Sequence, residues 1–193
     1  MKRLCVFCGS SRGNSAAFAI AARTLGETLA VRNIELIFGG SHVGLMGVVA
    51  DAALTNGGKV VGVLPRFMVD KELAHPRLTE LHVVETMHER KQLMAELAEG
   101  FIALPGGFGT LEEIFEAITW GQLHLHARPC GLLNVEGYFD SLLEFLRVTT
   151  ANGFVKRKQF ESLVVAATPE DLLARFAAFR PLKTDKWVST EVI

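Results

Sequence analysis

The feature that most constrains the fold is a regular alternation of short apolar runs with longer amphipathic stretches along most of the chain. The apolar runs predict strands at residues 4–7, 34–38, 59–63, 81–84, 100–104, 129–133 and 163–165. The stretches between them predict helices at residues 15–31, 44–56, 88–98, 110–123, 138–152 and 169–178. Strands this apolar, separated by helices, are typical of a mostly parallel sheet with helices on both faces. Right-handed connections would make it a doubly wound, Rossmann-like α/β fold.

The length of 193 residues suggests one domain with a sizeable core. We expect residues 1–179 to form this domain. Residues 180–193 lack periodicity and predict a C-terminal tail that is loose or packs on a partner.

Charge and hydropathy exclude several classes of protein. Lysine and arginine number 20 against 21 acidic residues, so the chain lacks the positive field of a general nucleic-acid binder. A small phosphorylated ligand would need only local positive charge. No apolar stretch reaches the roughly 18 residues of a transmembrane helix, and the apolar run after the N-terminus is too short for a signal peptide. We therefore expect a cytoplasmic protein with no membrane partner.

The cysteines and histidines predict neither a disulfide framework nor a metal site. Three cysteines are too few and odd in number for paired disulfides. Cys5 and Cys8 are three apart on a predicted strand, so they should point to opposite faces as buried thiols. His124 and His126 lack a third ligand at a recognisable spacing. We expect no metal.

Three glycine-rich segments follow predicted strands, at residues 9–14, 39–47 and 105–110. In an open parallel sheet, the carboxyl ends of the strands lie at one edge, and ligands bind in the crevice outside them. The sequence therefore predicts a ligand site where these segments meet.

The segment 105–110 has the composition of an anion site. Gly107 and Gly109 would let backbone N–H groups approach a ligand closely, and a helix starting there would add its dipole. Thr110 could cap that helix and donate its hydroxyl to a phosphate oxygen. A tight turn without a ligand is the alternative. The pattern is neither a Walker loop nor the dinucleotide fingerprint, so a mononucleotide or sugar phosphate suits it better than a nicotinamide cofactor.

Charged residues beside this segment have two interpretations each. Glu113 would stand at the mouth of the site, but it also completes a T-x-x-E capping box. Arg90 and Lys91 open the preceding helix, where positive charge opposes the helix dipole. Arg90 shares an inward face with Met94, which favours a nearby anion. Two solvated surface cations are the alternative.

Together these motifs resemble one known family. Residues 105–113, Pro-Gly-Gly-Phe-Gly-Thr-Leu-Glu-Glu, fit the pattern P-G-G-x-G-T-x-x-E, with Phe108 at the variable position. They are preceded by Met-His-Glu-Arg-Lys at 87–91, Cys-Gly-Ser-Ser at 8–11 and Phe-Gly-Gly at 38–40. The set resembles the Lonely guy family, the cytokinin riboside 5′-monophosphate phosphoribohydrolases, from about residue 3 to about residue 179. Members were long labelled lysine decarboxylases, but no lysine here is placed as a Schiff-base candidate beside a pyridoxal-phosphate cradle.

The resemblance implies hydrolysis of the N-glycosidic bond of a purine (cytokinin) riboside 5′-monophosphate or of AMP, releasing base and ribose 5-phosphate. It implies a nucleotide-binding domain that works without a cofactor, at least as a homodimer, with Arg90 and Glu113 as the catalytic pair. The substrate-site residues that it implies are Glu72, Arg90, Lys91, Gly107, Phe108, Gly109, Thr110, Leu111, Glu112, Glu113 and Thr119. A carboxylate could stabilise an oxocarbenium-like transition state while orienting or deprotonating water.

Two other functions compete with this hypothesis. A non-catalytic nucleotide or molybdopterin carrier could use the same scaffold, but it would have little use for a carboxylate at the mouth of a phosphate site. A single-stranded DNA-binding module would want a basic, aromatic-lined groove, which the balanced charge does not suggest. The choice between AMP and an N6-isopentenyl nucleotide stays open.

Overall fold

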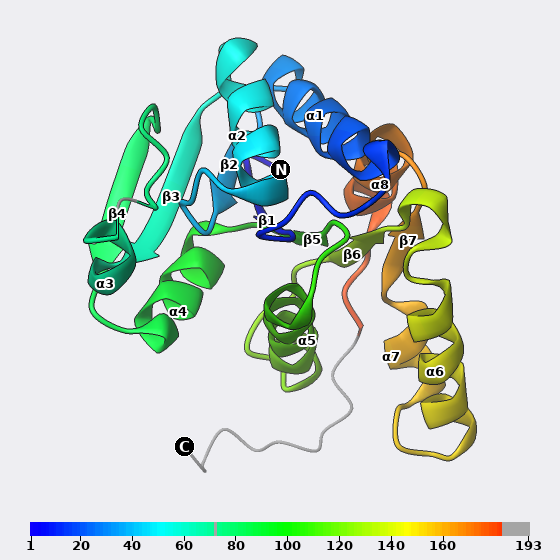
Figure 1. Cartoon of the computed structure of the whole chain (residues 1–193). Helices are drawn as coiled ribbons and strands as arrows, with labels where there is room; N and C mark the ends of the chain where they lie inside the picture. Colours follow the sequence, from blue (N-terminus) through cyan, green and yellow to red (C-terminus); the bar gives the residue numbers. More distant parts are fainter. Residues whose placement is uncertain (72, 183–193) are drawn as a thin grey trace.

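The computed structural model describes residues 1–71 and 73–182, and its centre is a parallel sheet (Figure 1). The strands are β1 (Arg3–Phe7), β2 (Glu35–Phe38), β3 (Val60–Pro65), β4 (Glu80–Val84), β5 (Phe101–Ala103), β6 (Cys130–Leu133) and β7 (Val164–Ala166). Their order across the sheet is β4-β3-β2-β1-β5-β6-β7, and each neighbouring pair is parallel. The predicted doubly wound α/β fold is confirmed.

The strand order places a switch point at the middle of the sheet. The chain runs outward from β1 to β4 and then returns to the other side of β1 to add β5, β6 and β7. The connections leaving β1 and β5 therefore diverge, which opens a crevice at the carboxyl ends of these strands.

Helices cover both faces of the sheet, as predicted. They are α1 (Ala16–Val31), α2 (Gly44–Thr55), α3 (Arg66–Val69), α4 (Met87–Leu97), α5 (Phe108–Gln122), α6 (Asp140–Ala151), α7 (Arg157–Glu161) and α8 (Pro169–Ala178), with a 3₁₀ turn η1 (Val135–Gly137). Apolar residues of α1, α2 and α8 pack on one face, and those of α4, α5 and α6 pack on the other (Figure 1). No helix in the described part of the chain is long and apolar enough to cross a membrane.

The period-two pattern of β1 shows how the strands are buried on both faces. Leu4 belongs to the core under α1 and α2, whereas Cys5 belongs to the core under α4 and α5. Cys8 lies on the same side as Leu4, so the cysteines three apart do face opposite ways. Both are free and buried, as is Cys130. Burial raises the pKa of Cys130 to about 12, which leaves it without a reactive thiolate.

Side-chain N-caps begin α1, α4 and α8. At α8, the Thr168 hydroxyl accepts a hydrogen bond from the Asp171 N–H and Pro169 occupies the first turn, as predicted. The helices α3 and α7 were not predicted, because segments of four or five residues are too short to show the helical repeat of apolar residues. The helix expected at 138–152 begins at Asp140, after the η1 turn. Of the predicted tail, residues 183–193 lie outside the described residues.

Candidate active site

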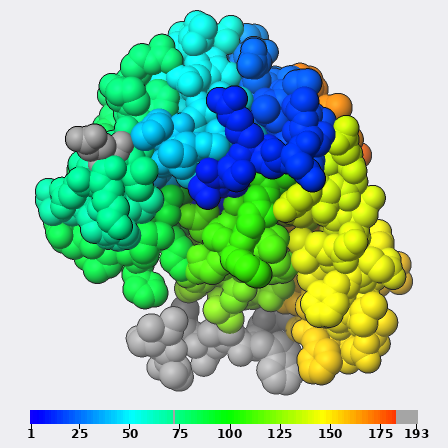
Figure 2. Space-filling model, in the orientation of Figure 1, coloured from blue at the N-terminus to red at the C-terminus, as the bar shows by residue number. Residues whose placement is uncertain are grey.

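The three glycine-rich segments meet at the carboxyl edge of the sheet. Gly9 donates a backbone hydrogen bond to Pro105 (3.1 Å) and accepts one from Leu45 (2.9 Å). Gly44 has a φ of +59° and lies so close to Ser10 that a Cβ would stand 2.2 Å from its carbonyl carbon. In Figure 2 the N-terminal segment, the segment after β2 and the start of α5 adjoin on one face of the molecule.

The turn after β5 leads directly into α5. Gly107 is the N-cap residue and Phe108 is the first helical residue, with a side chain that is 93% exposed. Thr110 therefore lies inside the first turn, where it is buried, and its hydroxyl packs so closely on Gly106 that a Cβ there would lie 2.1 Å away. The predictions that Thr110 caps this helix and forms a capping box with Glu113 are wrong, because the helix starts two residues before Thr110.

The fold itself does not require glycine at positions 107 and 109. Neither residue has a left-handed φ, and a Cβ on either would meet nothing within 4 Å. A tight turn without a ligand would therefore accept other residues here. The first N–H groups of a helix have no intrahelical acceptor, so the start of α5 offers donors to an anion across this open space.

Arg90 is held under the turn that follows β2. A capping box of Thr86 and Glu89 begins α4, which places Arg90 on the inward face of the helix. Arg90 is only 8% exposed, and its Nε donates to the carbonyl of Val63 at 3.1 Å. A Cβ on Gly39 would lie 1.8 Å from the Arg90 Nη2. The interpretation of Arg90 as a solvated surface cation is wrong.

The buried guanidinium faces Glu113. The Arg90 Nη1 lies 3.4 Å from the Glu113 Oε1, and the Glu113 side chain is 12% exposed. Burial raises the pKa of Glu113 above its ordinary value of 4.5, although Arg90 lowers it. A carboxyl group with a raised pKa beside an anion site is typical of an acid–base group. The structure thus brings together two residues that are far apart in sequence.

Lys91 faces a different set of carboxylates. Its ammonium contacts both Glu112 and Glu116, the latter at 3.0 Å. Burial lowers the pKa of Lys91, but the hydrogen bonds to Glu112 and Glu116 outweigh it and raise the pKa overall. These carboxylates occupy two of the three N–H donors of the ammonium. Lys91 nonetheless lowers the pKa of Glu113, so it acts on the site through its charge.

The remaining predicted site residues are spread along α5 or lie elsewhere. Thr119 is exposed on α5, and its hydroxyl donates to the Phe115 carbonyl at 2.7 Å. It lies six residues beyond Glu113, which is about 9 Å along the helix axis. Leu111 packs its side chain on the core beneath α5. Glu72 lies outside the described residues.

Sequence reasoning missed Tyr138 and gave no contact to Gly39. Tyr138, which follows β6, donates its hydroxyl to the Gly106 carbonyl at 2.7 Å and so fixes the turn before α5. Its position after a strand was the only available signal. Gly39 was placed in a glycine-rich segment, but its close contact with Arg90 depends on the tertiary packing.

His124 and His126 lie at the turn that follows α5, where both have structural roles. His124 has a φ of +62° just after the end of α5, and the His126 Nε2 lies 2.9 Å from the Ala117 carbonyl. Burial lowers the pKa of His126, which favours the neutral ring. Among the described residues, no group of three or more histidine, cysteine or acidic side chains could hold a metal ion.

The fold and this geometry define a Rossmann-like α/β protein with a glycine-rich helix start at the carboxyl edge of its sheet and a buried Arg–Glu pair between α4 and α5. A family model described as "Possible lysine decarboxylase" matches residues 46–176. The chain is 48% identical over 180 residues to a protein of Oryza sativa subsp. japonica named "Probable cytokinin riboside 5′-monophosphate phosphoribohydrolase", with 93% of this chain and 73% of that protein covered. It is 44% identical over 180 residues to a cytokinin riboside 5′-monophosphate phosphoribohydrolase of Arabidopsis thaliana, with 93% and 84% covered. The chain belongs to the Lonely guy family, and these relatives are named as phosphoribohydrolases of cytokinin riboside 5′-monophosphates.

Solved structures of lower identity share the fold. The molybdenum cofactor binding protein of Rippkaea orientalis has a TM-score of 0.70 at 20% identity, with 92% of this chain and 97% of that chain covered. At this identity the likeness concerns the fold alone.

Proposed function

We propose that this chain hydrolyses the N-glycosidic bond of a purine (cytokinin) riboside 5′-monophosphate or of AMP, releasing the base and ribose 5-phosphate. The observation that carries the proposal is the buried Arg90–Glu113 pair beside a turn whose glycines at 107 and 109 the fold does not require. Its relatives' names supply the class of substrate.

The phosphate is the anchor in this proposal. The N–H groups at the start of α5 and the helix dipole favour a dianion at Gly107, Gly109 and Thr110. Binding energy from this remote group can then hold the ribose in a reactive geometry. Phe108, Leu111 and Glu112 lie in the first turns of α5, beside these three residues. Glu72, Lys91 and Thr119 remain predictions from the resemblance.

Glu113 is the proposed acid–base group. As a carboxylate it can stabilise the positive charge that develops on the ribose and can orient or deprotonate the attacking water. Arg90 holds the carboxylate in place and limits the rise in its pKa. Neither step needs a metal ion or a cofactor.

The assembly and compartment are further parts of the proposal. The family resemblance favours at least a homodimer. Exposed apolar side chains such as Phe145 and Val148 on α6 are available for such contacts. The free buried cysteines are compatible with the reducing cytoplasm.

The test is release of free base from AMP and from its N6-isopentenyl analogue, quantified by chromatography. The variants Glu113→Gln and Arg90→Met should each lose about 10²-fold or more of kcat while staying folded by circular dichroism. The exposed pair Glu144 and Arg147, 2.9 Å apart on α6, offers a matched control as Glu144→Gln and Arg147→Met, which should keep the activity. Binding of both nucleotides without any release of base would refute the hydrolase and favour a carrier.

A further inference from the structure

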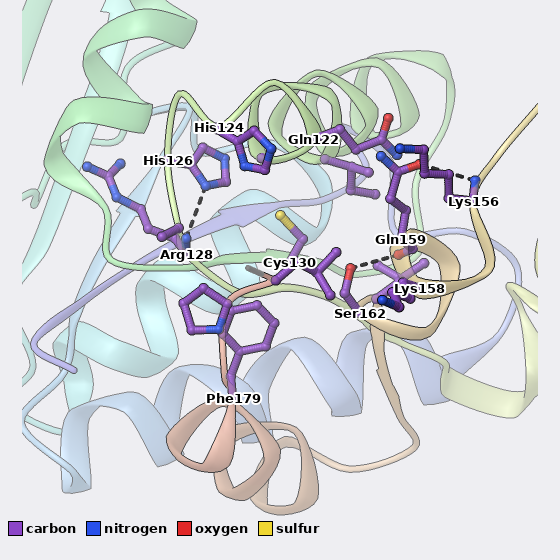
Figure 3. Close-up of a pocket in the computed structure, with 16 residues that line it drawn as sticks. Gln122, His124, His126, Arg128, Cys130, Lys156, Lys158, Gln159, Ser162 and Phe179 are labelled. Atoms are coloured by element: carbon purple, nitrogen blue, oxygen red, sulfur yellow. Dashed lines mark hydrogen bonds between the residues drawn. The ribbon is translucent and has the colours of Figure 1, made fainter. Parts of the chain in front are cut away.

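A second hollow lies at the opposite edge of the sheet from the candidate active site. Cys130, the first residue of β6, lies on its floor, so the hollow opens at the amino ends of the strands. Its other walls are the end of α5, the α7 region and the residues after α8 (Figure 3). The volume of about 830 Å³ is in the range of ligand pockets.

The cavity shares a helix with the candidate active site but not its residues. Glu113 is near the start of α5 and Gln122, which lines the cavity, is its last residue. Their separation of nine positions corresponds to about 14 Å along the helix axis. Ile118 lines the cavity nearer to Glu113, but no described residue that lines the cavity is a predicted substrate-site residue.

The charges around the cavity have one sign. Lys156, Lys158 and Arg128 line it, and no aspartate or glutamate does so among the described residues. Arg128 is engaged elsewhere, since its guanidinium points away from the cavity and contacts the Ala95 carbonyl (Figure 3). Lys156 and Lys158 have no ion pair within the described part of the chain. In a chain of net charge −1, this local excess of positive charge favours an anion.

The remaining lining is apolar with a few polar groups. The ring of Phe179 lies on the side of the cavity opposite the rings of His124 and His126, with the Cys130 thiol between them (Figure 3). Other apolar lining residues are Ile118, Leu163, Pro181 and Leu182. Lys156 and Lys158 are exposed at this cavity. Apolar walls with two cationic side chains are suited to a ligand that has an apolar body and an anionic group.

We propose that this cavity is a second ligand-binding site, separate from the nucleotide site, for a small organic anion with an apolar or aromatic body. Lys156 and Lys158 bind the anionic group, and Phe179 and Leu163 contact the apolar body. The proposal rests on the cavity and not on the hydrolase activity, so either can fail alone.

The test uses the full chain and two fluorescent probes of similar shape, anilinonaphthalene sulfonate and its uncharged counterpart phenylnaphthylamine. The sulfonate should bind at one site per chain, with an affinity that falls as salt increases. The double variant Lys156→Gln/Lys158→Gln should weaken sulfonate binding about tenfold and leave phenylnaphthylamine binding unchanged. A matched control, Lys2→Gln/Lys59→Gln, replaces two exposed lysines outside the cavity lining and should change neither.

Two further measurements separate the cavity from other places where a probe could bind. Saturating AMP should not displace the sulfonate, whereas Ser162→Trp, which fills the cavity, should abolish its binding. Displacement by AMP, equal binding to the double lysine variant, or the absence of saturable binding would each overturn the proposal.

Discussion

Replacing Gly39 by alanine should disable the site although both proposed catalytic residues, Arg90 and Glu113, are kept. The new Cβ would stand 1.8 Å from the Arg90 Nη2, whereas ordinary contact begins at 3.4 Å. The guanidinium must therefore retreat by about 1.6 Å, because the packed interior cannot absorb the overlap. The backbone tolerates the change, since Gly39 does not have a left-handed φ.

The displacement should affect activity more than stability. A shift of about 1 Å in a catalytic constellation can cost 10²-fold in rate, so kcat for base release should fall by about that factor. The free energy of unfolding should fall by about 1–3 kcal/mol from overpacking. Part of this loss is the strained hydrogen bond from the Arg90 Nε to the Val63 carbonyl. The variant should stay folded at 25 °C.

A double-mutant cycle tests whether the effect passes through Arg90. Base release would be measured for the parent, Gly39→Ala, Arg90→Met and the double variant, with urea unfolding of each. Methionine lacks the atoms that the new Cβ would meet, so Gly39→Ala should have little further effect on kcat in that background. Additive losses in kcat, or a Gly39→Ala enzyme of full activity, would refute the role assigned to the Gly39–Arg90 contact.

Three further predictions concern the neighbouring groups. Gly107→Ala should leave the free energy of unfolding within about 0.5 kcal/mol of the parent but raise KM at least about tenfold, since the methyl group occupies ligand space; an unchanged KM would contradict this. Because burial raises the folded-state pKa of Glu113, the stability of the parent relative to Glu113→Gln should fall as pH rises above the ordinary pKa of 4.5. Urea unfolding that gives the opposite slope would contradict the burial argument. Tyr138→Phe removes the hydrogen bond to the Gly106 carbonyl and should cost about 0.5 kcal/mol by thermal unfolding, and no loss would exclude that role.

The fold was predictable because its signals are local and repeated. Runs such as residues 4–7 are apolar on both faces, which only a sheet covered twice can accommodate. The sequence did not predict the short helices α3 and α7, because helices of four or five residues depend on contacts made by neighbouring elements. The predicted start of α5 was two residues too late. Threonine favours the N-cap position, so Thr110 was preferred, whereas the N-cap is Gly107 in an extended conformation.

The site was predictable only in part. The glycine-rich segments mark the sheet edge, and the inward face of α4 marks Arg90. The contact of Arg90 with Glu113 joins α4 to α5, and no local pattern encodes the distance between two helices. The partners of Lys91 could not be predicted either, because Glu112 and Glu116 lie on α5 and Lys91 lies on α4.

The charge balance at Glu113 bears on the choice between a hydrolase and a carrier. A carboxylate placed for stability beside an arginine would have its pKa held below the ordinary value. Here the separation of 3.4 Å and the burial leave the pKa of Glu113 raised, so the attraction to Arg90 does not offset the loss of hydration. A carrier would bind its anion better with an uncharged residue at this position. A carboxyl group whose pKa is raised by burial and that lies beside the proposed anion site is instead suited to exchanging a proton with water or substrate, a step that the proposed hydrolase needs and a carrier does not.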